Sequence, residues 1–388
     1  MVKAHTFLMP DYYPHFKCKM GACRHACCEG WRVTLSLNDY FRLESEDCSL
    51  ELREKIDKGI KISLTPSPDA YAYIQHDYFG KCPMRLDDGR CALHAELGEK
   101  ALAQVCRLYP RGIRVFPDYE CSCANSCEAV LEYLFDRDSS IEFIKQEMEL
   151  ELLEEVNNSV NFGTQGREQA IRLWLIKILQ NRKFSLANRL MNVGWALGLM
   201  DSCIENKNFS AIDKILSEPF IMVKNHFEVD KGHLLFGIDT MEKLLSIIDR
   251  GSDSIREYGE QALAYFGNDE MTFDKYEQAL KKFETTFPKW EIWFEHMLVN
   301  HVFFEQFPFQ DRPLGLWEEY VGISAVYSLL RFLGIGYMTN KERKEDFVDV
   351  SSAVFRLVDH TDFDRFASQV LSDLNCNSPQ KISDLIML

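Results

Sequence analysis

Hydrophobic positions follow a helical period through most of the chain after residue 140. One such stripe repeats at spacings of three and four residues and consists of Ile171, Trp174, Leu175, Ile178 and Leu179. The ranges 186–200 and 241–248 show the same period, and longer apolar stretches cover 290–304 and 316–333. We expect the last two to be central helices of a bundle, because they are long and apolar, and two prolines mark the break between them.

The first third of the chain has shorter patterns. Trp31, Val33 and Leu35 alternate with polar residues, which predicts a short strand. Ser36 and Asp39 then fit the start of a capped helix.

Further short elements are predicted before residue 137. We expect a strand at 71–74, a turn at 87–89, one helix over 94–109, a strand at 113–116 and a helix through 130–134. The turn would bring Cys82 and Cys91 together, and the helix over 94–109 would point Cys106 inward.

The composition changes near residue 136, where the cysteine-rich part ends. We therefore predict a mainly α protein with two domains: a cysteine-rich metal-binding domain with little β structure at 1–136, and an all-α domain at 137–388. The acidic run at 147–155 is expected to be the solvated face of a helix.

Composition and charge limit the possible functions. With 46% hydrophobic residues, the chain can bury a sizeable core. Its formal net charge of -16 argues against nucleic acid as a partner, because phosphate binding uses clustered Lys and Arg. The start has no apolar segment of signal-peptide length, and no run of eighteen apolar residues occurs, so we expect no membrane span and a cytoplasmic location.

Eleven of the thirteen cysteines lie between Cys18 and Cys127. Such a density indicates either disulfides or a metal site. Thiols stay reduced in the cytoplasm, which favours metal bound by thiolates. The gaps between successive cysteines are irregular, and Pro83 follows Cys82, both of which favour an iron–sulfur cluster over zinc. Zinc remains the alternative.

Two histidines lie close to these cysteines in the sequence. His25 and His94 are more typical of residues that support a metal site or face solvent than of ligands. The adjacent cysteines 27 and 28 cannot easily direct both sulfurs to one ion from regular structure, so one of them could face a second metal or the core.

Several motifs together resemble a known family. They are Cys-x4-Cys-x3-Cys-Cys-x2-Trp from Cys18, Cys82-Pro83, Gly89-x-Cys91, the segment around Cys106, and Ser126-Cys127-Glu128. In the helical part, the run from Ile171 to Gly194 and the segment with Asn300 and Phe309 add to the likeness. The chain resembles the flagellin lysine-N-methylase family and related cysteine-cluster proteins that chelate zinc or iron. Glu128 departs from the pattern, where proline is commoner.

This resemblance implies a cytoplasmic enzyme that transfers methyl groups from S-adenosylmethionine to lysine side chains of flagellin, with an iron–sulfur cluster, expected to be 4Fe-4S. Carried over by position, the resemblance implies eight metal ligands: Cys18, Cys23, Cys27, Cys28, Cys82, Cys91, Cys106 and Cys127. The other five cysteines are expected to be core thiols: Cys48, Cys121, Cys123, Cys203 and Cys376.

Two signatures of S-adenosylmethionine chemistry are absent from the sequence. There is no glycine-rich loop of the doubly wound nucleotide-binding type, and no Cys-x3-Cys-x2-Cys triplet. Use of S-adenosylmethionine is therefore implied by resemblance alone, and no catalytic residue is identified. A metal-binding protein without catalytic activity is the alternative.

Overall fold

A long strand pairing joins the start of the chain to the segment after the cysteine-rich part. The structure is a computed structural model, which describes residues 3–25, 27–28, 32–78, 80–115, 118–150, 163–218, 230–248, 253–267, 271–309, 314–361 and 363–388. Strand β1 (Lys3–Pro10) pairs antiparallel with β7 (Phe143–Leu150) along its whole length, from Lys3 opposite Leu150 to Pro10 opposite Phe143.

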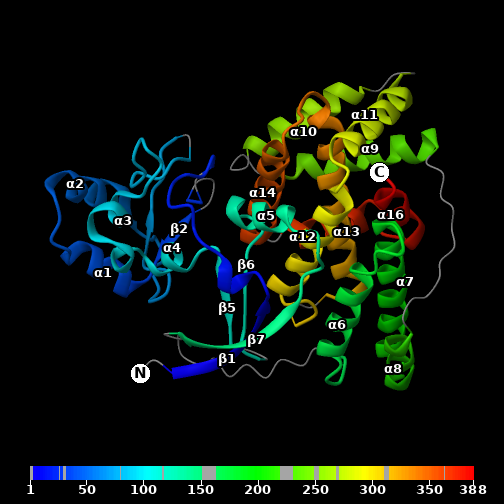
Figure 1. Cartoon of the computed structure of the whole chain (residues 1–388), viewed down its shortest axis with the longest axis horizontal. Helices are drawn as coiled ribbons and strands as arrows, with labels where there is room; N and C mark the ends of the chain where they lie inside the picture. The colour runs from blue at the N-terminus through cyan, green and yellow to red at the C-terminus, as the bar shows by residue number, and fades with distance from the viewer. Residues whose placement is uncertain are drawn as a thin grey trace.

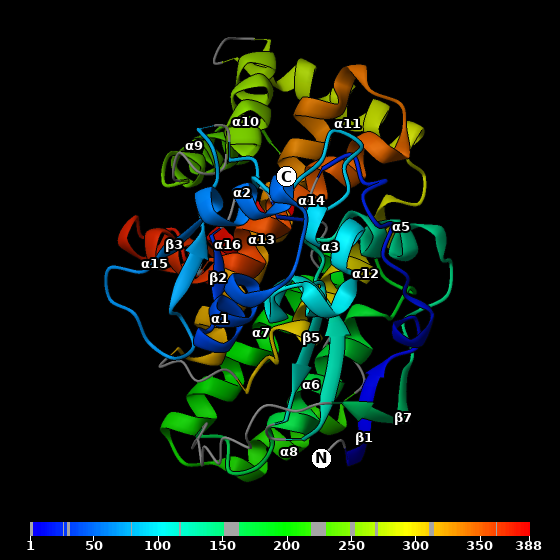
Figure 2. The same ribbon diagram turned by 90° about the vertical axis from the view of Figure 1, so that its left-hand side faces the viewer.

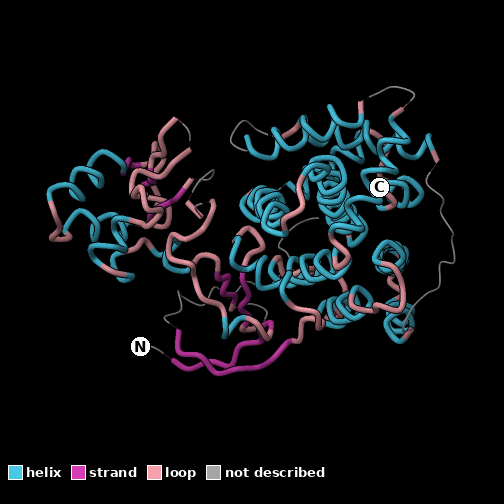
Figure 3. Tube along the Cα trace, turned by 45° about the horizontal axis from the view of Figure 1, so that its top comes forward, coloured by secondary structure: helices cyan, strands magenta, loops and turns pink. Residues whose placement is uncertain are grey.

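Two small sheets lie in different parts of the molecule (Figure 3). The first has the order β5-β6-β1-β7 and adds β5 (Arg111–Arg114) and β6 (Glu120–Cys123), with β1 and β6 parallel. The second has the order β2-β4-β3 and consists of β2 (Val33–Leu35), β3 (Ile60–Ile62) and β4 (Ala72–Ile74).

The second sheet belongs to a separate lobe, which we call the cysteine lobe and define as the described residues of 32–106. Its helices are α1 (Leu37–Ser45), α2 (Leu50–Gly59), α3 (Ala92–Leu97) and α4 (Gln104–Leu108), with a 3-10 turn at Glu99–Ala101. A hydrophobic core of its own runs from Val33 to Ala103. Figure 1 shows this lobe beside the rest of the molecule, and in Figure 2 it faces the viewer.

The remaining described residues, apart from the loop at residues 18–28 and the end of α4, form the helical body, which includes the first sheet. It begins with a 3-10 turn at Tyr13–His15 and α5 (Glu128–Asp136). The helices that follow are α6 (Glu168–Leu179), α7 (Leu186–Glu205), α8 (Phe209–Ser217), α9 (Lys231–Ser246), α10 (Asp253–Phe266), α11 (Thr272–Thr286), α12 (Trp290–Phe304), α13 (Leu316–Gly336), α14 (Lys344–His360), α15 (Phe363–Asp373) and α16 (Pro379–Ile386). A second, larger core joins these helices to β1, β6 and α5.

Helix α13 is the central helix of the body. Its segment Leu316–Asn340 is long and apolar enough to cross a membrane, with a mean hydropathy of 1.4, but 94% of that window is buried within the fold. Burial on all sides explains why it is apolar all round, as expected for a helix in the centre of a fold.

The mainly α prediction is confirmed, and several elements match closely. Helix α12 covers the predicted 290–304, and Ser36 caps α1 by accepting a hydrogen bond from the Asp39 N–H at 3.1 Å. The alternating pattern that began at Trp31 gives β2, although Trp31 itself lies outside the described residues.

Other expectations are wrong. The single helix over 94–109 is three short pieces, because Gly98 adopts a φ of +82° that an α-helix cannot continue through. The part of the acidic run up to residue 150 lies in β7, not in a helix, and the rest of that run lies outside the described residues. Residues 137–388 are thus not entirely helical.

The predicted boundary at residue 136 remains a prediction. The two hydrophobic cores divide the chain differently, because the second core contains Phe7, Cys121 and Leu134 as well as the later helices. The cysteine lobe therefore lies between two segments of the helical body in sequence.

Candidate metal centre

The eight cysteines implied as ligands come from four segments and interact with one another. The segments are the first cysteine loop (residues 18–25 and 27–28), the segment from Cys82 to Cys91, helix α4 with Cys106, and the start of α5 with Cys127. Cys28 lies close enough to Cys27 and Cys82 for both to affect its pKa, which Cys27 lowers and Cys82 raises.

Electrostatic interactions connect the remaining thiols. The charge of Cys27 contributes to raising the pKa of Cys91 and that of Cys106. Cys23 and Cys27 together contribute to raising the pKa of Cys127. Cys18 likewise contributes to raising the pKa of Cys23. The eight thiols thus affect one another's pKa, and we call them the thiol cluster, although among the described residues no three of these sulfurs lie within 4.8 Å of one another. Their role as metal ligands stays a prediction.

The predicted turn at 87–89 is present and shapes the second segment. The Gly89 N–H donates to the Leu86 carbonyl at 3.0 Å, the Leu86 N–H donates to the Arg90 carbonyl at 2.9 Å, and Arg85 pairs with Cys91 in an antiparallel bridge. Gly89 has a φ of +86°, a conformation that glycine adopts without steric cost. The turn brings the two cysteine-bearing sides of this segment together.

The same glycine lets this turn contact the first cysteine loop. A Cβ on Gly89 would overlap the Gly21 carbonyl oxygen, and a Cβ on Gly21, whose φ is +99°, would lie 2.8 Å from the Arg90 nitrogen. The backbones therefore cross at a distance that only glycine permits on both sides. This contact links the cysteine lobe to the first cysteine loop.

Charged residues attach the first cysteine loop to the helical body. Glu128, which is buried at the start of α5, accepts from Lys19 Nζ at 2.7 Å and from the Arg24 N–H at 2.8 Å. The Arg24 side chain also pairs with Asp349 on α14 at 2.8 Å. Glu128, the residue that departs from the family pattern, therefore positions the loop that carries four of the cysteines.

Burial and crowding favour protonated thiols in the absence of a cation. Burial raises the pKa of Cys23 to about 12, with further contributions from Glu128 and Cys18. Burial likewise raises the pKa of Cys127 to about 12. For Cys27 the hydrogen bond with Cys28 and then burial raise the pKa, and Arg356 on α14 acts in the opposite direction.

A metal ion or an iron–sulfur cluster would supply the positive charge that such thiolates need, because coordination deprotonates thiols. The donor set is rich in sulfur, which suits soft or borderline metals such as iron and zinc. The residues present therefore fit a thiolate-bound metal centre.

Two of the thiols lie at helix N-termini. Cys127 is the N-cap residue of α5, where the backbone amides of Ala129 and Val130 act to lower its pKa. Cys91 precedes α3, and the amides of Leu93 and His94 act on it in the same way. Amide dipoles at a helix start favour a thiolate over a thiol.

The five cysteines expected to be core thiols lie in or against the hydrophobic cores. Cys121 and Cys123 on β6 and Cys376 are buried in the core of the helical body, and Cys203 packs against it. Cys48 packs against the core of the cysteine lobe. Cys121 forms a hydrogen bond with Tyr13.

A buried polar network fixes the segment before Cys127 onto α12. Asn300 donates from Nδ2 to the Cys123 carbonyl at 2.8 Å and to Asn125 Oδ1 at 2.7 Å, and its Oδ1 accepts from the Tyr12 hydroxyl at 2.5 Å. Asn125 donates to the Met297 carbonyl at 2.9 Å. Asn300 thus holds Cys123 and Asn125, which shortly precede Cys127, against α12.

A cavity of about 500 Å³ lies beside the first cysteine loop. Its lining includes Tyr12, Lys19, Glu132, Tyr133 and Arg137, a mixture of aromatic and charged side chains. Small-molecule sites commonly have volumes of about 300–1,000 Å³. The cavity can therefore accept a molecule of cofactor size.

Sequence reasoning missed the residues of α14 that face this region. Asp349 pairs with Arg24, and the charge of Arg356 acts to lower the pKa of Cys27. Asp359 accepts a hydrogen bond from the Ser126 N–H through Oδ2 at 3.0 Å. Asp349 and Arg356 are seven residues apart, the spacing of one helix face, but nothing in the local pattern relates them to cysteines more than 200 positions away.

Comparison with known proteins gives a consistent result. The chain is 31% identical over 112 residues to a lysine-N-methylase of Salmonella choleraesuis, which is 28% of this chain and 27% of that protein. It is 30% identical over 112 residues to the flagellar biosynthetic protein FliU of Salmonella muenchen, which is 28% of this chain and 64% of that protein. The aligned part covers less than two thirds of these relatives, and no solved structure matches.

The family model extends the similarity through the helical body. It describes the FliB lysine N-methylase C-terminal domain and matches residues 172–388, from α6 to the end of the chain. The thiol cluster lies before the matched region. Because the match covers more than half of the residues, the chain belongs to the FliB lysine N-methylase family.

Proposed function

We propose that this protein is a lysine N-methyltransferase that acts on flagellin in the cytoplasm, uses S-adenosylmethionine and carries an iron–sulfur cluster on its cysteines. Family membership and the names of the relatives, lysine-N-methylase and flagellar biosynthetic protein, support a methyltransferase with a flagellar substrate. The single observation that supports the cluster is that thiols from four segments lie close enough to affect one another's pKa.

The thiol cluster offers more sulfur donors than one iron–sulfur cluster uses, since a 4Fe-4S cluster takes four thiolates. Cys28, Cys82, Cys91 and Cys106 come from the side of the cysteine lobe, and Cys127 comes from the helical body. A bound cluster would supply either a structural link or redox chemistry. Ligands from both sides would also tie the cysteine lobe to the helical body.

Methyl transfer requires a neutral lysine amine aligned with the methyl–sulfonium bond. The protein must therefore bind the methyl donor and the lysine side by side and accept a proton from the amine. We propose the cavity beside the first cysteine loop as the methyl-donor site, because its volume is suitable and Tyr133 offers an aromatic face. Tyr133→Ala should weaken S-adenosylmethionine binding in a calorimetric titration.

The decisive experiment is a transfer assay on anaerobically purified full-length protein. Incubation with flagellin and S-adenosylmethionine should add methyl groups to lysine side chains, detected as mass increments of one methyl in place of one hydrogen. Flagellin incubated without the protein is the control. Absence of any increment from protein with a full metal complement would contradict the proposal and favour a metal-binding protein without catalytic activity.

The identity of the metal has its own test. An iron–sulfur cluster gives a brown, oxygen-sensitive protein that contains iron and acid-labile sulfide. A colourless protein with stoichiometric zinc would contradict the iron–sulfur part of the proposal and leave methyl transfer to be judged by the transfer assay.

A further inference from the structure

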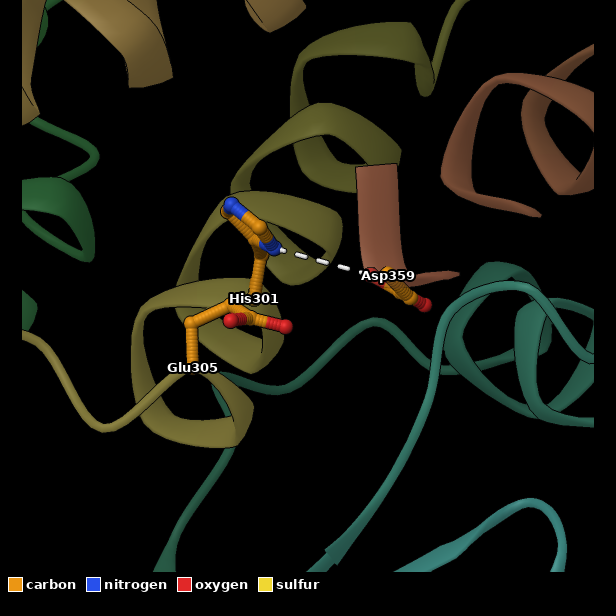
Figure 4. A group of neighbouring side chains, drawn as sticks. All are labelled: His301, Glu305 and Asp359. Carbon is orange, nitrogen blue, oxygen red and sulfur yellow. Dashed lines mark ion pairs between the residues drawn. The ribbon is translucent and has the colours of Figure 1, made fainter. Parts of the chain in front are cut away.

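Three side chains from two helices form a compact group near the thiol cluster but separate from it. His301 and Glu305 lie on consecutive turns at the end of α12, and Asp359 lies at the end of α14 (Figure 4). One donor atom from each residue lies within 4.8 Å of the other two. The four-residue spacing of His301 and Glu305 places both on one side of the chain as it leaves α12.

Two atoms in this group are buried without a hydrogen-bond partner among the described residues. They are His301 Nδ1 and Asp359 Oδ1, and their side chains are 2% and 1% exposed. Leaving a buried polar atom unsatisfied costs about 1–3 kcal/mol, so native proteins rarely do it without a reason. A ligand between the two atoms would satisfy both.

The distance between these atoms favours a shared ion over a direct bond. His301 Nδ1 and Asp359 Oδ1 are 3.8 Å apart, which is too long for a hydrogen bond, and they form an ion pair only when His301 is protonated (Figure 4). Two ligand atoms that each lie about 2.1 Å from a common metal ion are roughly 3–4 Å apart. The separation therefore matches two ligands of one ion.

Neighbouring groups hold the donors in place. Asp359 accepts from the Ser126 N–H through its other oxygen at 3.0 Å, which leaves Oδ1 directed to His301. Glu305 is half-buried, so the group remains reachable from solvent on its side. The charges of two further neighbours also affect the pKa of Glu305, which Asp364 raises and Arg114 lowers.

The donor chemistry selects the kind of ion. Two carboxylates and a neutral imidazole carry two negative charges in a largely buried place, which a divalent cation neutralises. Imidazole favours first-row transition metals over Mg²⁺ and Ca²⁺, and carboxylates extend the range to Mn²⁺. The group contains no sulfur, which distinguishes it from the thiol cluster.

We propose that His301, Glu305 and Asp359 bind one divalent first-row transition-metal ion, in a second site that is independent of the thiol cluster. The site joins the ends of α12 and α14. Through Asp359 and Ser126 it also contacts the residue before Cys127. The proposal does not depend on methyl transfer.

Mn²⁺ is a suitable probe, because it prefers oxygen and nitrogen donors to thiolates. Full-length protein that carries its own thiol-bound metal is titrated with Mn²⁺, and free Mn²⁺ is followed by electron paramagnetic resonance. We expect one bound Mn²⁺ per chain. Glu305→Gln and Asp359→Asn should each weaken binding by at least about tenfold, since the loss of even an outer-shell partner has an effect of this size.

Glu342→Gln is the matched control, since it removes the same charge from an exposed position just before α14. It should bind Mn²⁺ as the unaltered chain does. Mn²⁺ should also raise the melting temperature of the unaltered chain and of the control, but not that of Glu305→Gln. Failure of the unaltered chain to bind Mn²⁺, or equal binding by Glu305→Gln, would overturn the proposal. Glu305 is only half-buried, so its variant stays informative even if Asp359→Asn does not fold.

Discussion

The cysteine lobe and the helical body are stabilised in different ways. The buried core of the cysteine lobe contains only fourteen hydrophobic residues and includes several alanines. Its helices are at most ten residues long, and its strands have three residues each. In the helical body, one core runs from β1 to the last residue, and α13 alone is buried along almost its full length.

This difference indicates where the fold depends on something other than apolar burial. Small domains with thin cores usually need disulfides, metals or a partner surface. No disulfide joins any of the thirteen cysteines, all of which lie in the described part of the chain, and the ion pairs that attach the first cysteine loop are partly exposed, as at Lys19 and Arg24. Exposed ion pairs contribute little. The cysteine lobe should therefore depend on metal, whereas the helical body should not.

The largest expected effect is that of metal removal. Chelation, or replacement of Cys82, Cys91 or Cys106 by Ala, should remove the thiol-bound metal and greatly speed amide exchange in the cysteine lobe, because metal binding and folding are coupled. Structural metals contribute about 10 kcal/mol in small domains. Helices such as α12 and α13 should keep their protection. Hydrogen-exchange mass spectrometry reads both regions at once, and unchanged exchange in the cysteine lobe would refute this dependence.

A buried ion pair tests whether the stability of the helical body depends on its own buried contacts and not on metal. Arg189 on α7 pairs with Glu295 on α12 at 2.6 Å, and the two side chains are 2% and 0% exposed. Arg189→Met leaves the Glu295 carboxylate buried with only Arg182 to pair with it, and should destabilise the protein by roughly 3–5 kcal/mol. Denaturant unfolding measures the loss, and metal content should not change.

The control for that variant is a more exposed arginine–carboxylate pair. Arg167 binds Asp213 through two hydrogen bonds of 2.7 and 2.9 Å, and the Asp213 side chain is 56% exposed. Arg167→Met should cost less than about 1 kcal/mol. Equal losses from both arginine variants would mean that burial does not set the strength of these pairs.

The two regions also differ in how far the sequence predicted them. Helix α12 was predicted with its observed bounds, because its apolar and aromatic run is long and ends shortly before Pro308. The predicted helix over 94–109 is broken at Gly98. A single glycine is tolerated in many helices, so the sequence did not reveal that this one adopts a positive φ.

Long-range pairing accounts for the other differences. Residues 147–150 look helical and acidic in isolation, but they pair with residues 3–6, which overrides local preference. Strand β6 was missed because its alternating cysteines were considered only as possible ligands and core thiols. For the candidate site, the family resemblance implied which thiols are ligands, but their neighbours Glu128, Asp349 and Arg356 are brought to them by tertiary packing.

A smaller effect is expected where the two regions meet. Gly89→Ala introduces a Cβ that would overlap the Gly21 carbonyl, so the turn and the first cysteine loop must move apart. The strain should amount to about 1–3 kcal/mol and should lower the metal content of the purified protein. Gly166→Ala is the control, because Gly166 has a φ of +82° but nothing within 4 Å of its added Cβ. It should show the cost of a positive φ alone, with full metal content. A metal loss as large in Gly166→Ala as in Gly89→Ala would show that the close contact is not what matters.

The smallest effect concerns one core cysteine in each region. Cys48 packs against the core of the cysteine lobe, and Cys203 packs against that of the helical body. Each acts as a small, partly buried apolar residue, so Cys48→Ala and Cys203→Ala should each reduce the free energy of unfolding by only about 1 kcal/mol. Elemental analysis should find the same metal content in both variants as in the unaltered chain, whereas Cys91→Ala should lose metal. If Cys48→Ala loses metal as completely as Cys91→Ala, or if Cys91→Ala keeps its full complement, the division into eight ligands and five core thiols is wrong. In that case the stability of the cysteine lobe would have to come from a different set of sulfurs.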